Sequence, residues 1–198
     1  MKRTGFTLIE LLIVVAIIAI LAAIAIPNFL QAQTRAKVSR AQADMRSLGT
    51  GLESYFVDWN DYPPDWSHGV GAGPYRHFQR LLPITTPIAY TTSLPVDPFA
   101  RAEENAGVQN TYVYAAKHLS GHDNIAFEYE QWKLVAFQLN IPDQYHNLFW
   151  YLRSVGPDGN PVTLGSGDIN NAEVMLYDPT NGTISPGELV RTNMGIMN

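Results

Sequence analysis

The sequence predicts an α+β protein in which one long N-terminal helix packs on a small antiparallel β-sheet body. Three observations support this fold class: an apolar run over residues 6–26, helical periodicity that continues over 27–59, and short β-branched or aromatic segments between turn sequences after residue 60. A helix with an apolar stripe and a sheet with an apolar face are expected to cover each other. A chain of 198 residues has room for one domain with an appended helix.

The apolar run of residues 6–26 contains only two polar side chains, Thr7 and Glu10. As a helix with a rise of about 1.5 Å per residue, it would span about 31 Å, which matches the hydrocarbon core of a bilayer. Lys2 and Arg3 precede the run, and no basic residue follows before position 35. The positive-inside rule therefore predicts a single membrane pass with the N-terminus in the cytoplasm and the body on the other side.

This run differs from an ordinary secretory signal peptide, whose apolar region is about 7 to 15 residues long. The better candidate cleavage point lies before the run, at Gly5. Cleavage there would remove residues 1–5 as a leader and would leave the apolar helix on the mature protein.

The amphipathic half of the same helix is predicted over residues 27–59. Pro27 should kink or locally loosen the helix where the two halves meet, because proline lacks an N–H and clashes with the preceding turn. The sequence "NDYPP" at 60–64 should end it. The apolar side chains that we expect to pack on the body recur at helical spacing and are Met45, Leu48, Leu52, Tyr55, Phe56 and Trp59.

The body is predicted over residues 60–198. Residues 75–82 are expected to form two short turns of helix, and the turn sequences "GPDG", "GSGD" and "DPTNG" separate the later strands. Strands are expected at residues 111–116, 133–139, 149–155, 173–177 and 189–192.

Composition excludes several classes of function. The net charge is −5, and residues 59–198 carry fourteen acidic side chains against seven basic ones, which argues against nucleic-acid binding. The chain has no cysteine, so disulfides and thiol chemistry are excluded. No nucleophile elbow, P-loop or dinucleotide-binding fingerprint occurs. We therefore expect a protein that is not an enzyme.

The N-terminal "KRTG" followed by "FTLIELL" resembles the processing signal of type IV pilin-like precursors. The resemblance implies that a prepilin peptidase cuts after Gly5 and methylates the new N-terminus, Phe6. It places Glu10 at the fifth position of the mature chain. Pro27 falls where pilins commonly have a proline, and it is expected to shape the helix for filament assembly.

Glu10 is the unusual residue in this apolar helix. At a helix centre an intramembrane carboxylate costs about 2.5 to 3.5 kcal/mol, and less near the interface, so such residues are by default functional. The alternative is a sequence accident. We favour a role in assembly, in which Glu10 of one subunit pairs with the Phe6 amine of its neighbour and selects one axial register.

Short blocks in the body resemble, in order, those of the major, G-type pseudopilin of type II secretion. They are "YPP" at 62–64, "SLPVDPFA" at 93–100, "YVYAA" at 112–116 and "LRSVGPDGN" at 152–160 with a following "GDI". Departures from that subunit are an insert at 117–148, a longer tail after residue 170, and Phe99-Ala100 in place of Trp-Gly.

This resemblance implies a subunit of the periplasmic pseudopilus, anchored in a bacterial inner membrane before assembly. Its implied partners are further copies of itself, minor pseudopilins, the prepilin peptidase, and an inner-membrane assembly platform with its ATPase. Two alternatives stay open. One is a type IV pilus subunit serving adhesion, motility or DNA uptake, in an extracellular filament. The other is a single-pass anchored binding protein that never polymerises.

The loop "SVGPDGNPVTLGSGDI" at 154–169 has two interpretations. One is a Pro-Asp-Gly turn between strands. The other is a Ca²⁺ site, in which Asp158 and Asp168 supply hard carboxylate oxygens and backbone carbonyls such as that of Val155 complete the ligands. The resemblance to G-type subunits implies such a calcium site.

Two further groups have a structural explanation that we prefer. His118 and His122 with Asp123 have metal-ligand spacing for a helix, but the intervening "LSG" is typical of a solvated loop. Aromatic side chains near the end of the helix resemble a sugar-binding platform, yet core packing explains most of them. They are Tyr55, Phe56, Trp59, Tyr62, Trp66, Tyr75 and Phe78.

Overall fold

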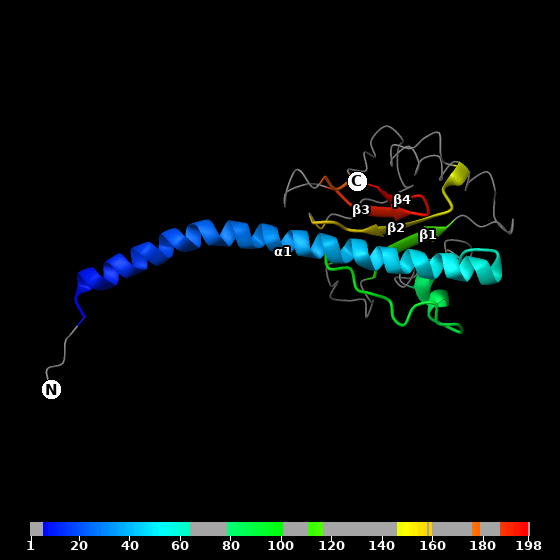
Figure 1. Cartoon of the computed structure of the whole chain (residues 1–198), viewed down its shortest axis with the longest axis horizontal. Coiled ribbons are helices and arrows are strands. Elements are labelled where there is room, and N and C mark those ends of the chain that lie inside the picture. Colours follow the sequence, from blue (N-terminus) through cyan, green and yellow to red (C-terminus); the bar gives the residue numbers. More distant parts are fainter. Residues whose placement is uncertain are drawn as a thin grey trace, which may run out of the picture.

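The structure, a computed structural model, consists of one long helix with a small body packed around its C-terminal half (Figure 1). The helical elements are α1 (Leu8–Trp59) and a short 3₁₀ helix, η1 (Gln79–Ile84). The strands are β1 (Val113–Ala116), β2 (Trp150–Ser154), β3 (Leu189–Thr192) and β4 (Gly195–Met197). The residues that the structure describes are 6–63, 79–100, 111–116, 146–157, 159, 176–178 and 187–197.

Helix α1 is continuous over 52 residues, a length of about 78 Å. Asn60 ends it in the left-handed conformation (φ 52°), and its N–H donates to the Phe56 carbonyl at 2.8 Å. The end predicted at the "NDYPP" sequence is confirmed. Pro27 does not interrupt the helix; instead α1 curves gradually along its N-terminal half (Figure 1). Proline removes a single backbone donor, which a long helix tolerates by bending.

The C-terminal half of α1 contributes the helical side chains of the hydrophobic core. Met45, Leu48 and Leu52 are fully buried, as predicted, and Tyr55 and Phe56 pack half-buried against the same cluster. Trp59 differs from the prediction, since it is 55% exposed. It is the last residue of the helix, and its indole N–H donates to the Tyr90 hydroxyl at 3.2 Å, away from the core.

The sheet is antiparallel throughout, with strand order β1-β2-β3-β4. Leu152 in the middle of β2 pairs with Tyr114 on one side and Arg191 on the other. The strands predicted within 111–116, 149–155 and 189–192 are confirmed. Strand β4 was not predicted, because it has only three residues and follows β3 after a two-residue turn.

The strand predicted at 173–177 is wrong for the part that the structure describes. Leu176 forms only an isolated parallel bridge with Glu188, and the Tyr177 N–H donates to the Glu188 carbonyl at 3.0 Å. This segment therefore runs parallel to the chain just before β3 and adds no strand to the sheet in the part that the structure describes. Residues 173–175 and the strand predicted at 133–139 lie outside the described residues.

Residues 79–100, which we call the strap, lie on the side of α1 opposite the sheet (Figure 1). The strap begins with η1, so the helical turns predicted at 75–82 appear as a 3₁₀ helix whose first described residue is Gln79. The Tyr90 hydroxyl donates to the Asp58 carboxylate at 2.7 Å. Further along, the Lys37 ammonium lies 6.0 Å from the centre of the Phe99 ring. The strap and the sheet therefore pack on two sides of the C-terminal half of α1 (Figure 1).

Trp150 fixes α1 on the sheet. Its indole lies against Gly49, where an added Cβ would be 3.0 Å from the ring, so any larger residue would have to displace the indole. Its N–H donates to the Glu53 carboxylate at 2.7 Å, and the Tyr62 hydroxyl lies 3.3 Å from the same carboxylate. Burial, followed by the charge of Glu53, raises the pKa of Tyr62 to about 12.

Candidate functional site

The N-terminus of α1 is a capping box formed by Thr7 and Glu10. The Glu10 N–H donates to the Thr7 hydroxyl oxygen at 3.3 Å, while the Glu10 carboxylate accepts from the Thr7 N–H at 2.9 Å and from its hydroxyl at 2.7 Å. The two residues thereby satisfy backbone donors that a helix start leaves unpaired. This geometry holds the Glu10 carboxylate at the tip of the helix, four residues from Phe6.

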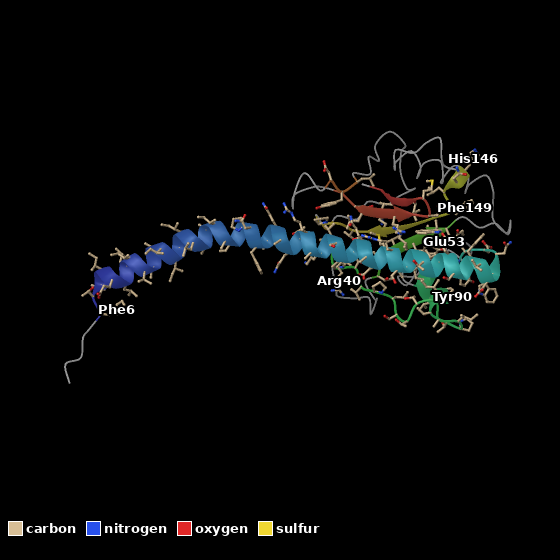
Figure 2. All side chains as sticks on the ribbon, in the orientation of Figure 1. Phe6, Arg40, Glu53, Tyr90, His146 and Phe149 are labelled. Atoms are coloured by element: carbon tan, nitrogen blue, oxygen red, sulfur yellow. The ribbon has the colours of Figure 1, made fainter. Side chains whose placement is uncertain are left out.

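The N-terminal half of α1 projects from the body as an uncovered apolar surface (Figure 2). Phe6 is 76% exposed, and the large apolar side chains from Leu8 to Leu30 are exposed along the whole projecting segment. The helix includes an 18-residue window with a mean hydropathy of 3.2 and none of it buried, so it is long and apolar enough to cross a membrane. An exposed apolar surface of this extent requires a lipid or protein partner.

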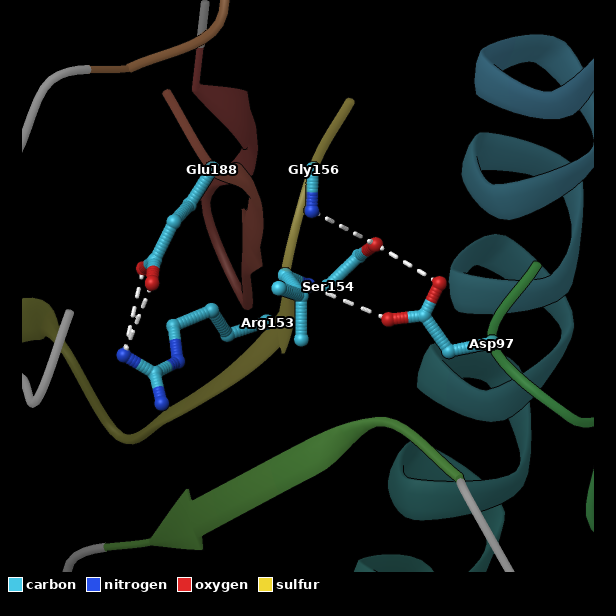
Figure 3. Close-up of polar contacts among 6 residues, drawn as sticks. Asp97, Arg153, Ser154, Gly156 and Glu188 are labelled. Atoms are coloured by element: carbon cyan, nitrogen blue, oxygen red, sulfur yellow. Dashed lines mark hydrogen bonds and ion pairs between the residues drawn. The ribbon is translucent and has the colours of Figure 1, made fainter. Parts of the chain in front are cut away.

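A second polar cluster lies in the body, around the buried carboxylate of Asp97 (Figure 3). This carboxylate accepts from the Ser154 hydroxyl at 2.9 Å, the Val155 N–H at 3.1 Å and the Phe99 N–H at 2.9 Å. Burial raises the pKa of Asp97, although these three hydrogen bonds oppose the shift. Asp97 thus ties the strap to the chain where it leaves β2.

On the other side of β2, Arg153 forms a buried ion pair with Glu188 (Figure 3). One guanidinium nitrogen of Arg153 donates to both carboxylate oxygens, at 3.0 and 3.2 Å. Alongside this pair, Gly156 adopts a φ of 80° and lies directly against the Gly187 carbonyl. These contacts set the path of the chain after β2.

Comparison with known proteins identifies the family of this chain. Residues 1–26 match the family model described as the prokaryotic N-terminal methylation motif. A type II secretion system core protein G from Pseudomonas aeruginosa is 31% identical over 121 residues, which cover 61% of this chain and 78% of that protein. The chain belongs to the type IV pilin-like family.

Pilins match a shorter part of this pilin-like chain than core protein G does. The type IV major pilin protein PilA of Myxococcus xanthus is 49% identical over 75 residues, covering 38% of this chain and 34% of the pilin. The type IV wide pilus major component PilA4 of Thermus thermophilus is 53% identical over 69 residues, covering 35% of this chain and 53% of that protein. The chain therefore spans only about a third to a half of these two relatives. No solved structure gives a significant match.

Two predicted residues of the pilin-like chain, Phe6 and Glu10, lie at the projecting N-terminal end of α1. Phe6 precedes the cap, Glu10 is part of it, and Pro27 lies exposed within the helix. Gly5 lies outside the described residues. Thr7 was not predicted as a partner of Glu10, although its Thr-x-x-Glu spacing is the sequence pattern of a capping box.

Of the predicted calcium ligands, the structure describes Val155 alone; Asp158 and Asp168 lie outside the described residues. In the part of the chain that is described, no group of three or more His, Asp or Glu side chains has metal-binding geometry. His118, His122 and Asp123 also lie outside that part. Asp97 accepts a hydrogen bond from the Val155 N–H, and this role was not predicted. In the sequence, Asp97 belongs to no motif other than the "LPVDPFA" block that resembles G-type pseudopilins.

In the described part of the aromatic cluster, Tyr62 is buried in the core and Tyr55 and Phe56 pack half-buried against it, whereas Trp59 is exposed. Phe56 stacks on Tyr62 with ring centroids 4.7 Å apart, and Tyr55 contacts both Trp59 and Tyr90. These contacts favour the prediction of core packing over a sugar-binding platform. Trp66, Tyr75 and Phe78 lie outside the described residues.

Proposed function

We propose that this chain is a structural subunit of the pseudopilus that drives type II protein secretion. The observation that carries the proposal is the match to core protein G, which reaches beyond the helix into the body and covers 78% of that protein. The two pilin matches described above cover 38% and 35% of this chain. A body that resembles core protein G on a pilin-like helix favours the pseudopilus.

In this function the chain begins as an inner-membrane precursor with its body in the periplasm. A prepilin peptidase cuts after Gly5 and methylates Phe6. An assembly platform with its ATPase then moves the apolar helix from lipid into a filament. The filament consists of copies of this chain together with minor pseudopilins. The exposed apolar surface of α1 supports this transfer, because helix packing replaces lipid contacts with protein contacts. The chain is a substrate of processing enzymes rather than an enzyme.

The alternative is a type IV pilus subunit, which the identities of 49% over 75 residues and 53% over 69 residues to pilus components favour. Deletion of the gene separates the two functions. We expect loss of exoprotein secretion with surface fibres intact. Loss of surface fibres with normal secretion would instead identify a pilus subunit.

A non-polymerising membrane-anchored binding protein is the alternative from another class. The mass of the full chain extracted from membranes tests it, together with imaging of sheared filaments. We expect a mass that lacks residues 1–5 and includes one methyl group, and filaments that contain the chain. An uncut chain that starts at Met1 would contradict every filament function.

We also propose that the loop at 154–169 binds Ca²⁺ through Asp158 and Asp168 with the Val155 carbonyl. Carboxylate and carbonyl oxygens are the ligands that Ca²⁺ prefers. The hydrogen bond from the Val155 N–H to Asp97 supports the proposal, because it fixes the backbone from which the loop departs. A bound Ca²⁺ ion would hold this glycine-rich loop in one conformation.

Thermal unfolding of the detergent-solubilised chain tests this site. With Ca²⁺ about 100-fold above its Kd, we expect the body to gain about 2.7 kcal/mol relative to chelator. The Asp158→Asn/Asp168→Asn variant should lose this gain, and Mg²⁺ at equal concentration should not supply it. Equal unfolding midpoints in calcium and in chelator would show that the loop binds no calcium.

A further inference from the structure

The segment of α1 that follows the apolar surface is basic. Between Glu10 and Asp44 the sequence has no acidic residue and three basic ones, which we call the basic collar: Arg35, Lys37 and Arg40. All three side chains are exposed. Figure 2 labels Arg40 where the projecting part of α1 meets the body. Positive charge therefore gathers at this point of a chain whose body is acidic.

The charge of the collar is only weakly compensated within the described part of the chain. Arg35 and Lys37 form no ion pair there, and the Lys37 ammonium lies 6.0 Å from the centre of the Phe99 ring. Arg40 faces Asp44 at 3.8 Å, which is long for an ion pair, and its side chain is 68% exposed. The collar is therefore available to an anionic partner.

The apolar surface that precedes the collar fits the hydrocarbon core of a bilayer. Its large exposed side chains extend from Leu8 to Leu30. At a rise of about 1.5 Å per residue this is about 33 Å, which a slightly tilted helix matches to a hydrocarbon core of about 30 Å. A membrane that covers this surface therefore has its hydrocarbon edge close to Leu30.

The position of the collar along the axis points to lipid headgroups as its partner. Arg35 lies about 7.5 Å beyond Leu30, Lys37 about 10.5 Å and Arg40 about 15 Å. The headgroup layer extends roughly 5 to 8 Å beyond the hydrocarbon core on each side. Arg35 thus lies level with headgroup phosphates, and Lys37 lies just above them, within reach of a long basic side chain.

The collar surrounds the helix rather than marking one side of it. Because successive residues of an α-helix are turned by about 100°, Arg35 and Lys37 project from nearly opposite sides, about 200° apart. Arg40 projects from a third direction, about 140° from Arg35. A protein partner would contact one side of α1, whereas headgroups surround a helix where it leaves a membrane. The distribution of the three charges therefore favours lipid over protein.

We propose that the basic collar binds the phosphate groups of anionic phospholipids while the chain is anchored in the membrane. This proposal rests on the membrane-anchored precursor of the proposed function and adds a lipid contact where α1 leaves the bilayer. Guanidinium and ammonium groups donate charge-assisted hydrogen bonds to phosphate oxygens. The attraction to an anionic surface falls off within a Debye length, so Arg35 contributes most and Arg40, beside Asp44, contributes least.

Native mass spectrometry of the uncut full-length chain tests the contact. The chain is released from nanodiscs that contain equal amounts of phosphatidylglycerol, which is anionic, and phosphatidylethanolamine. We expect the unmodified chain to retain about tenfold more phosphatidylglycerol than phosphatidylethanolamine, and Arg35→Gln to lower this ratio by about fivefold. The matched control is Arg46→Gln, the same charge change at an exposed position of the same helix, about 24 Å beyond Leu30. It should change the ratio by less than about twofold.

Three outcomes would overturn the lipid contact and leave the filament function standing. The first is equal retention of the two lipids by the unmodified chain. The second is an equal loss of phosphatidylglycerol from Arg35→Gln and Arg46→Gln. The third is an Arg35→Gln variant that forms fewer filaments with an unchanged lipid ratio, because the collar would then bind a protein. A chain that alkaline carbonate extracts from membranes would instead overturn the anchored precursor, and with it both the filament function and the lipid contact.

Discussion

The Glu10→Ala variant is expected to insert in the membrane and to lose residues 1–5 normally, yet to form about a hundredfold fewer filaments. Insertion should not suffer, because alanine removes a polar group from an apolar helix. Assembly should fail because the Phe6 amine of the neighbouring subunit would lose its counter-ion. Removing one partner of a buried ion pair costs about 3 to 5 kcal/mol, and each ~1.4 kcal/mol is a tenfold change in an equilibrium constant.

The capping box complicates this experiment, because Glu10 also closes the start of α1 with Thr7. Thr7→Ala separates the two roles, since it removes the cap hydroxyl and keeps the carboxylate. Loss of an N-cap costs about 1 kcal/mol, so filaments of Thr7→Ala should fall by about fivefold at most. Intact mass checks processing, and sedimentation with imaging measures filaments. Filaments from Glu10→Ala at the level of the unmodified chain would refute the pairing.

The helix was predictable because its determinants are local. Twenty-one consecutive residues almost free of polar groups, helical spacing through Leu52, and the "NDYPP" sequence fix its extent. The effect of Pro27 was less predictable, since bending and breaking depend on how the neighbouring turns relax. Trp59 was assigned to the core from periodicity alone, but periodicity does not show where the sheet ends along the helix. The structure leaves Trp59 half exposed.

The body was harder to predict because its decisive contacts join residues far apart in the chain. Asp97 and Ser154 are separated by 57 positions, and Glu53 and Trp150 by 97. No local sequence pattern indicates either contact. The segment around Leu176 has the composition of a strand, yet strand formation depends on a free sheet edge in the right place. The features at the N-terminus are local instead, since Gly5, Phe6, Thr7 and Glu10 lie within six residues, although the cap formed by Thr7 was not predicted.

Trp150→Ala is expected to lower the free energy of unfolding of the body by about 3 to 5 kcal/mol. Trp150 is 2% exposed, and its indole joins β2 to α1, where it lies against Gly49 and donates to the Glu53 carboxylate. Its removal would leave a cavity between helix and sheet and would take from Glu53 its shortest hydrogen bond. Urea unfolding of the detergent-solubilised full-length chain, followed by near-ultraviolet circular dichroism, measures the loss.

Three further variants distinguish lost volume from lost polar contact. Trp150→Phe keeps most of the ring and should cost about 1 to 3 kcal/mol, mainly through the missing indole N–H. Gly49→Ala should destabilise by about 1 to 2 kcal/mol, because the new Cβ would press on Trp150. Gly51→Ala should instead stabilise by up to ~1 kcal/mol, since its Cβ would meet Ile84 at an ordinary 3.6 Å and alanine favours the helix. Equal effects at the two glycines would mean that Trp150 does not set the separation between α1 and the sheet.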